Sequence, residues 1–390
     1  MTEPPADVLI AGASVRALAE SAAVAGYRVV ALDGYADLDL CVRVRALSLR
    51  RDLGAAYSAA RAARAAADIA APTVAYASGF ENHPTALAAL ARGRTLWGNT
   101  AAVVRHVRRP TALAEALGAR GFAVPDVRTT RVAAAPSGGR EWLVKPVRSG
   151  GGHGIGGWRP GGRLPRGMYL QERIQGEPGS IVFVADGRRA VPLGMSRQLA
   201  GDPAFGGTGF RYSGSLLSGA APVFEREAEI ASAAARLATV VTEAFGLVGL
   251  NGIDFIARDG VPWPIEVNPR YTASMELVER AHGVSVFALH ARACAGELPG
   301  FGSLLGRRLG AVWGKAIVYA TANVTMREIR RWWRDDRVRD VPHPGERIGR
   351  GRPICTLLAS AGSPAECRQA LAAHAAEIYS AATIADRSVA

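Results

Sequence analysis

The sequence predicts an α/β fold followed by an α+β fold, and two observations support this division. The first 105 residues open with an apolar run, a helix-forming stretch that ends at Gly26, and a second apolar run at Val29–Leu32, which is a strand–helix–strand pattern. From Trp142 onward, short apolar segments alternate with Gly, Pro and Asp-Gly turns, a texture typical of antiparallel hairpins. The chain of 390 residues is 49% hydrophobic, and it is therefore large enough for about two or three domains.

The N-terminal strand–helix–strand unit predicts a parallel sheet with helices on its faces. Its first turn, GASVRA, lacks the GxGxxG fingerprint of dinucleotide-binding folds, although Asp33 lies near the place of a ribose-binding acid. We therefore favour a Rossmann-like fold whose first loop only makes a turn. An NAD-binding site is the weaker interpretation. An alanine- and arginine-rich helix is expected over residues 51–70.

The rest of the chain divides into two further segments. Long helices are expected over Glu225–Phe245 and Glu276–Cys294, between the short strands. After residue 305 the pattern is strand, loop, strand and a closing helix from Pro364. We predict a Rossmann-like domain at 1–105, an α+β domain of two lobes at 106–300 and a small β-rich domain at 301–390.

The formal net charge is +13, and nearly all of the excess is arginine, because the chain has only two lysines, Lys145 and Lys315. No block of Lys and Arg with interleaved aromatic residues is present, so we expect a solvated basic surface and no nucleic-acid partner. An attraction for anionic substrates is a secondary interpretation.

No apolar run reaches the length of a membrane span, and the N-terminal stretch lacks the basic region of a signal peptide. The four cysteines lie far apart and show neither CxxC nor metal-ligand spacing, which fits a reducing compartment. We expect a cytoplasmic protein with small-molecule substrates, without a membrane partner, and with a homodimer as a candidate assembly.

A glycine-rich stretch, LVKPVRSGGGHGIGGW, follows a predicted strand that carries Lys145. Glycine lets backbone N–H groups approach an anion closely and tolerates positive φ, and a lysine beside such a loop supplies a compact cation for phosphate. The lysine precedes the glycines, so the stretch is not a P-loop. A surface loop with an incidental lysine is the alternative, and the scarcity of lysine in this chain weighs against it.

The stretch NGIDFIARDGVPWPIEVNPR predicts a hairpin that carries hard oxygen ligands. With a loop of residues 259–261, Asp254 lies opposite Glu266, and Asn268 shares their face because side chains alternate along a strand. Two carboxylates and a carboxamide are ligands that Mg²⁺ prefers, and Mg²⁺ often bridges to substrate phosphates. Arg270 is then placed to hold an anion beside the metal. A solvent-facing polar strand face is the alternative.

These stretches, with MYLQERIQGEPGS between them, resemble the ATP-grasp superfamily. The resemblance covers the order KP, glycine-rich loop, QERI and D…ExNPR, over roughly residues 106–295. It implies an ATP-grasp fold preceded by a Rossmann-like domain and followed by a small C-terminal domain. It also implies an ADP-forming ligase that uses ATP with Mg²⁺ or Mn²⁺ to convert a carboxylate into an acyl phosphate, which an amine then attacks.

The resemblance implies roles by position. Lys145 contacts the ATP phosphates and Arg270 stabilises the acyl phosphate, which makes these two the catalytic candidates. Asp254, Glu266 and Asn268 bind the metal. The remaining ATP contacts are a loop over the phosphates, an adenine hinge and a ribose acid, and they are Gly150, Gly151, Gly152, His153, Gly154, Gln171, Glu172, Arg173, Ile174 and Glu177.

Two departures from the superfamily pattern concern ATP. Many members carry a second ATP-binding lysine near the start of the domain, where this chain has VRHVRRPT. Arg105, Arg108 or Arg109 takes its place, or the contact is absent. The ribose acid Glu177 is also out of the usual step with the hinge.

Three further stretches, ASGFENHP, LWGN and PGERIGRGRPICTLLA, resemble a narrower group within the superfamily. Its members accompany tetrahydromethanopterin-linked one-carbon metabolism, and the group is similar to tyramine–glutamate ligase of methanofuran synthesis. This resemblance implies cofactor biosynthesis, with glutamate as one reactant. Glu81 either binds the acceptor substrate or caps a helix that starts at residue 82, and Arg197 and Arg211 are candidates for a substrate carboxylate.

Other classes of function are weaker interpretations. A bicarbonate-using carboxylase shares the acyl-phosphate chemistry, but the sequence has no biotin-attachment segment. A non-catalytic nucleotide-binding regulator would have no need of the metal-binding set.

Overall fold

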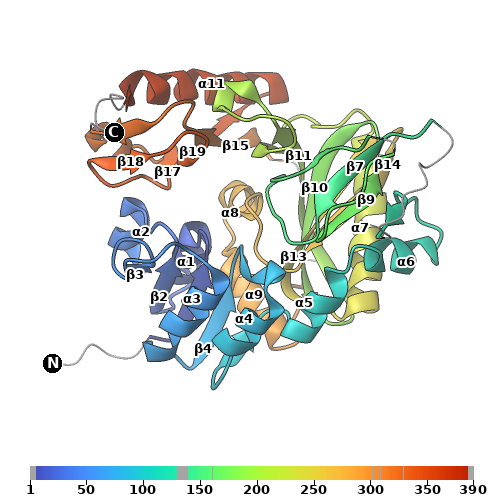
Figure 1. The fold of residues 1–390 in the computed structure, drawn as a ribbon, viewed down its shortest axis with the longest axis horizontal. Coiled ribbons are helices and arrows are strands. Elements are labelled where there is room, and N and C mark those ends of the chain that lie inside the picture. The colour runs from blue at the N-terminus through green and yellow to red at the C-terminus, as the bar shows by residue number, and fades with distance from the viewer. Residues whose placement is uncertain are drawn as a thin grey trace.

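The computed structural model describes residues 6–129, 139–159, 161–300, 303–305, 307, 309–327 and 329–384. Figure 1 shows the N-terminal part of the chain below the C-terminal part, with the middle of the chain beside both. The mixed α/β architecture predicted from the sequence is confirmed: a parallel sheet comes first and antiparallel sheets follow. Among the residues that the structure describes, no helix is both long and apolar enough to cross a membrane.

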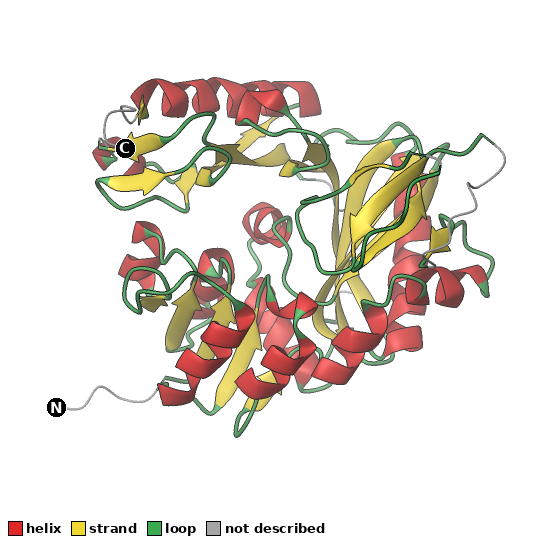
Figure 2. Cartoon of the chain, in the orientation of Figure 1, coloured by secondary structure: helices red, strands yellow, loops and turns green. Residues whose placement is uncertain are grey.

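The N-terminal unit is a five-stranded parallel sheet in the order β3-β2-β1-β4-β5. Its first two strands are buried at every position, which is why they read as continuous apolar runs. Helices cover its faces (Figure 2). The bounds are β1 Val8–Gly12, α1 Arg16–Val24, β2 Val29–Asp33, α2 Leu38–Arg43, β3 Arg45–Ser48, α3 Ala59–Ala65, β4 Thr73–Tyr76, α4 Pro84–Leu90, β5 Thr95–Trp97 and α5 Ala101–Val107.

The middle of the chain forms two antiparallel sheets. A small sheet in the order β6-β9-β7-β8 carries the glycine-rich loop, and a large sheet begins β14-β13-β10-β11-β12. The bounds are α6 Ala112–Gly118, β6 Val127–Arg128, β7 Trp142–Pro146, β8 Gly156–Gly157, β9 Met168–Glu172, β10 Glu177–Asp186, β11 Ala190–Ala200, β12 Tyr212–Leu217, α7 Glu227–Phe245, β13 Val248–Arg258, β14 Val261–Asn268, α8 Met275–His282 and α9 Val286–Cys294.

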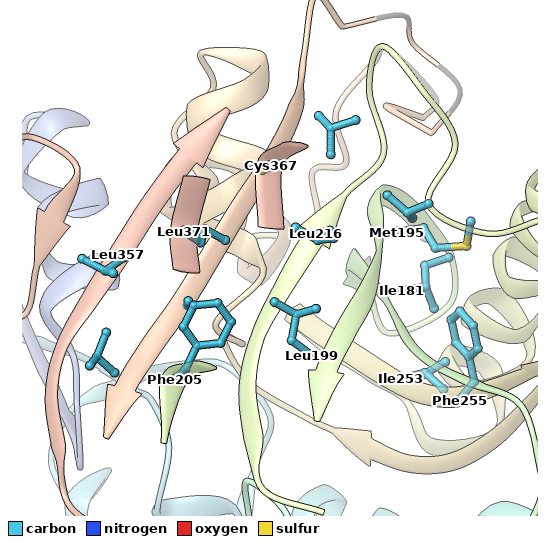
Figure 3. Packing of buried hydrophobic residues seen from close by; sticks show 14 of the residues in the cluster. Ile181, Met195, Leu199, Phe205, Leu216, Ile253, Phe255, Leu357, Cys367 and Leu371 are labelled. Carbon is cyan, nitrogen blue, oxygen red and sulfur yellow. The ribbon is translucent and has the colours of Figure 1, made fainter. Parts of the chain in front are cut away.

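The C-terminal strands continue the large sheet, which runs on from β12 through β15, β19 and β17. Helix α11 packs on β19 and β15, and the same apolar core extends from Phe255 on β13 to Leu371 on α11 (Figure 3). The division predicted near residue 300 therefore falls between strands of one sheet. The bounds are β15 Val312–Tyr319, β16 Val324–Met326, α10 Arg330–Trp333, β17 Val338–Arg339, β18 Glu346–Ile348, β19 Pro353–Ala361, α11 Pro364–Ala381 and β20 Thr383–Ile384.

Two predicted helices differ from the structure. The single helix expected over Glu276–Cys294 is wrong: Gly283 takes φ +64°, a left-handed conformation that ends a helix, and α9 starts after a new cap at Ser285. The helix expected over residues 51–70 is shorter, because Ser58 caps its first turn and the regular helix ends at Ala65. The closing helix from Pro364 is confirmed, and Ser363 and Glu366 form a capping box at its start.

Candidate functional site

The site is built around the hairpin of β13 and β14. Its turn consists of two residues, Asp259 and Gly260, at φ +54° and +80°, so the three-residue loop expected from the sequence is wrong. Positive φ at both central positions matches the right-handed twist of the two strands. A bulge next to Asp254 adds one residue to β14 and brings Glu266 opposite Asp254. The expected pairing is therefore confirmed, although the turn and the bulge together produce it.

Three oxygen-bearing side chains converge on one face of this hairpin. Asp254 Oδ2 accepts a hydrogen bond from Asn268 Nδ2 at 2.9 Å, and Asp254 Oδ1 accepts one from Gln198 Nε2 at 2.9 Å. Burial, and next the charge of Glu266, raise the pKa of Asp254 to about 6. Two negative carboxylates this close together repel each other, and a cation bound between them would remove that repulsion. In the described ranges, no cluster of three His, Cys, Asp or Glu side chains is arranged for a metal. The candidate metal set therefore includes a carboxamide, that of Asn268, beside the carboxylates of Asp254 and Glu266.

Glu266 also binds an arginine that the sequence left undecided. Arg108 Nη1 donates to the Glu266 carboxylate, and its Nη2 donates to Asn82 Oδ1 at 2.9 Å and to the carbonyl oxygen of Ser149 at 3.1 Å. Burial alone would raise the pKa of Glu266, but attraction from Arg108 and then from Lys145 outweighs it and lowers that pKa.

Arg108 is thus the arginine that reaches the site. Arg105 is exposed on α5, and Arg109 pairs with the exposed Glu115 at 3.3 Å.

Lys145 reaches the site from β7 in the small sheet. Its ammonium donates to Gln171 Oε1 at 2.9 Å, and Gln171 Nε2 in turn donates to the carbonyl oxygen of Ile265 at 3.2 Å. Lys145 is only 5% exposed, and burial lowers its pKa against the attraction of Glu266 and Asp254. This chain of contacts links the small sheet to the hairpin that carries the two acids.

The glycine-rich loop closes over this cavity from the small sheet. The carbonyl oxygen of Gly151 accepts a hydrogen bond from the backbone N–H of Tyr212 at 3.1 Å, which docks the loop on the start of β12. Gly152 has φ +76°, and a Cβ there would lie 1.8 Å from the carbonyl oxygen of Phe210. Only glycine fits at this position.

The cavity between the two sheets has a volume of about 460 Å³. It brings together most of the expected site residues: Lys145, Gly151, Gly152, Gln171, Glu172, Arg173, Ile174, Asp254, Glu266, Asn268 and Arg270. Four expected residues do not line it: Gly150, His153, Gly154 and Glu177.

The two acids among the expected ATP contacts, Glu172 and Glu177, both have protein partners. Glu177 pairs with Arg197 at 3.1 Å, and its side chain is 45% exposed. The carboxylate of Glu172 accepts a hydrogen bond from the backbone N–H of Asp126 at 3.2 Å, which joins the hinge strand to β6.

Two further acids have structural partners that the sequence did not reveal. Glu81 is 2% exposed, and its Oε1 accepts a hydrogen bond from Arg270 Nε at 2.7 Å, so it orients Arg270 and does not cap α4. Asp33 accepts hydrogen bonds from the backbone N–H groups of Val15, Tyr35 and Ala36. This favours the interpretation of the first loop as a turn.

The order of these elements matches a known family. Residues 111–274 match the ATP-grasp domain. This part of the chain therefore has the ATP-grasp fold. Among curated proteins, an uncharacterized protein of Methanocaldococcus jannaschii is 28% identical over 120 residues, which is 30% of this chain and 28% of that protein. The chain thus matches well under a third of that relative's length.

Solved structures resemble nearly the whole chain, so the ATP-grasp fold extends beyond the matched domain. An ADP complex of N5-carboxyaminoimidazole ribonucleotide synthetase has a TM-score of 0.68 at 17% identity, over 97% of this chain and 98% of that one. L-amino acid ligase from Bacillus licheniformis has a TM-score of 0.66 at 17% identity, over 99% and 100%.

A third structure is a complex with ligands. It is the biotin carboxylase domain of 2-oxoglutarate carboxylase from Hydrogenobacter thermophilus, with MgADP and bicarbonate, and it has a TM-score of 0.69 at 15% identity over 92% and 87% of the two chains. At these identities the likeness shows the shared fold.

Proposed function

We propose that this protein is an ATP-dependent, ADP-forming ligase that joins a carboxylate to an amine. The observation that carries the proposal is the cavity in which Lys145, Arg270 and the set of Asp254, Glu266 and Asn268 meet beneath the glycine loop. An anionic nucleotide with its cation fits this arrangement of charges, and the remaining cavity wall is formed by the hinge strand.

The three oxygen-bearing side chains fit Mg²⁺ or Mn²⁺. The observation behind this fit is the raised pKa of Asp254, about 6, which burial and the neighbouring Glu266 produce. Asp254, Glu266 and Asn268 would hold the metal, and the metal would neutralise phosphate charge. Arg108 pairs with Glu266, so its guanidinium lies beside the proposed metal site and would contact the phosphates once the metal takes its place at Glu266.

ATP would lie between the two sheets. Lys145 would contact its phosphates and the backbone N–H groups of the loop at Gly151 and Gly152 would cover them. Residues 171–174 line the same cavity and would receive the adenine.

In this reaction the protein mainly positions the substrates and stabilises charge. A carboxylate oxygen attacks the γ-phosphorus, the bond to ADP breaks, and an acyl phosphate forms. The amine nitrogen then attacks the acyl carbon, phosphate leaves, and the amine loses a proton. Arg270, held by Glu81 at 2.7 Å, would stabilise the charge on the acyl phosphate, and a closed loop would exclude water.

The three stretches that resemble the narrower group support glutamate and a cofactor precursor as substrates. ASGFENHP supplies Glu81 and Asn82, and Asn82 Nδ2 donates to the carbonyl oxygen of Ser149 in the glycine loop at 3.2 Å. LWGN supplies Asn99, which donates to Asn251 at 2.8 Å and to the carbonyl oxygen of Pro269 at 3.1 Å. The first two of these stretches therefore contact the segments around the proposed catalytic residues.

The proposal is tested by ADP release over a panel of carboxylic acids and amines, with bicarbonate included because a solved relative binds it. We expect ADP release that requires both an acid and an amine. Glu266→Ala should abolish turnover while the protein stays folded by circular dichroism. Release of ADP by Glu266→Ala at the wild-type rate would contradict the proposed metal set. Absence of ADP release with every acid would contradict the ligase itself.

A further inference from the structure

A second cavity, of about 500 Å³, lies outside the ATP-grasp hairpin. One wall comes from the loops after β1 and β2, through Ser14, Tyr35 and Asp37, and the facing wall comes from β15 and β19. Figure 1 shows these two groups of elements facing each other, with α2 below β17 and β18. None of the residues assigned to ATP above contributes to this cavity except His153.

One acid in this cavity lacks a protein partner. The neighbouring acids are all engaged: Asp33 accepts three backbone N–H groups, Asp39 accepts those of residues 340 and 341, and Asp340 pairs with Arg16 at 2.7 Å. Asp37 precedes α2, but its side chain makes no capping bond. Within the described part of the chain, the Asp37 carboxylate has neither a hydrogen bond nor an ion pair.

The surroundings of Asp37 favour a cationic ligand there. Burial, and next the charges of Asp340 and Asp33, raise the pKa of Asp37 well above its ordinary value. These surroundings disfavour the charged form of the Asp37 carboxylate. A bound ammonium group would stabilise that charged form through a charged hydrogen bond.

The other end of the cavity is cationic and adjoins the ATP cavity. Arg211 lines it, with its guanidinium 3.6 Å above the ring of Tyr319. The buried Nε of Arg211 has no hydrogen-bond partner among the described residues. Arg352 lines the same end. Tyr212, next in the chain after Arg211, lines the ATP cavity and holds the glycine loop through Gly151.

We propose that this cavity binds the carboxylate substrate, and that the substrate is an amino acid held as a zwitterion. Its ammonium group binds Asp37, and its reacting carboxylate lies at the Arg211 end, toward the ATP phosphates. This inference rests on the proposed function, in which glutamate is one candidate acid, and it adds the site that would hold the ammonium group. An acid without an amino group leaves the half-buried Asp37 carboxylate unpaired when it covers the cavity, and such an unpaired acid opposes binding.

The test compares amino acids with their analogues that lack the amino group, such as L-glutamate with glutarate and L-alanine with propionate. ADP release is measured with ATP, Mg²⁺ and hydroxylamine as the amine. We expect the preferred acid to be an amino acid, with kcat/KM about 10- to 100-fold above that of its analogue, the range for one charged hydrogen bond.

Asp37→Asn should lower kcat/KM for the preferred amino acid by a similar factor and leave the analogue and the affinity for ADP unchanged. Asp259→Asn is the matched control, since Asp259 is 87% exposed on a hairpin turn, and it should behave as wild type. Arg211→Gln should raise KM for both members of each pair.

The possible results separate this inference from the ligase proposal. A preferred acid that lacks an amino group would overturn the inference and leave the ligase proposal intact. The same conclusion would follow if a folded Asp37→Asn variant still preferred the amino acid to its analogue by the wild-type factor. If Asp37→Asn does not fold, the wild-type comparison of each pair decides alone. No ADP release with any acid would overturn the proposed function and the inference together.

Discussion

Replacement of Asp254 by Asn should stabilise the metal-free protein in a pH-dependent way. Burial and Glu266 raise the pKa of Asp254 from 3.8 to about 6 in the folded chain. Folding therefore favours the protonated acid, so the native state loses stability as the pH rises from about 4 to about 6 and levels off above that. With 1.36 kcal/mol for each pH unit, the loss is about 3 kcal/mol at pH 8 and about 1 kcal/mol at pH 4.5.

The measurement is urea unfolding of wild type and Asp254→Asn in EDTA over this pH range. Asn cannot accept hydrogen bonds from both Asn268 and Gln198, as Asp254 does, which adds a cost of about 1 kcal/mol that does not vary with pH. The difference in unfolding free energy should nevertheless shift by about 2 kcal/mol in favour of the variant between pH 4.5 and pH 8.

Metal provides the second readout of the same variant. Mg²⁺ at 100 times its dissociation constant should stabilise wild type by about 2.7 kcal/mol, and it should have little effect on Asp254→Asn. Asp259→Asn, in the turn of the same hairpin, should keep the wild-type pH dependence and the wild-type response to Mg²⁺. A difference that is constant with pH, or equal stabilisation of both proteins by Mg²⁺, would refute the reasoning.

Three further substitutions test the phosphate side of the site. Lys145→Met should weaken ATP binding by about 1.5–3 kcal/mol, the range for a hydrogen bond to a charged group; an unchanged calorimetric affinity would rule out the contact. Arg108→Gln should remove the cation beside Glu266 and raise the pKa of that carboxylate, which is detectable by NMR titration, and a pKa equal to wild type would count against the pair. Gly152→Ala should displace the glycine loop, because its Cβ would collide with the carbonyl oxygen of Phe210; ATP affinity should fall while the circular dichroism spectrum stays the same, and wild-type affinity would show that the loop tolerates the side chain.

The sequence by itself determined the elements whose signals are local. Continuous apolar runs predict the buried strands of the parallel sheet, and the Ser363–Glu366 capping box marks the start of α11. The alternation of side chains on β14 places Glu266 and Asn268 on one face whatever the rest of the fold does. For this reason the parallel sheet and the candidate metal set could be predicted from the residues, whereas the ATP-grasp fold is predicted from the resemblance of the motifs and their order.

Only the tertiary structure decided which distant side chains meet. Glu81 and Arg270 are 189 positions apart, and nothing near Glu81 in the sequence distinguishes an Arg partner from a helix cap. Arg105, Arg108 and Arg109 share one short stretch, and only the fold places Arg108, the residue just after α5, beside Glu266. Asp37 becomes a candidate only in the folded chain, where the neighbouring acids Asp33, Asp39 and Asp340 are bound to distant residues and Asp37 is not. A contact between residues far apart in the sequence depends on how the sheets and helices pack in space. Local propensity and periodicity do not determine that packing.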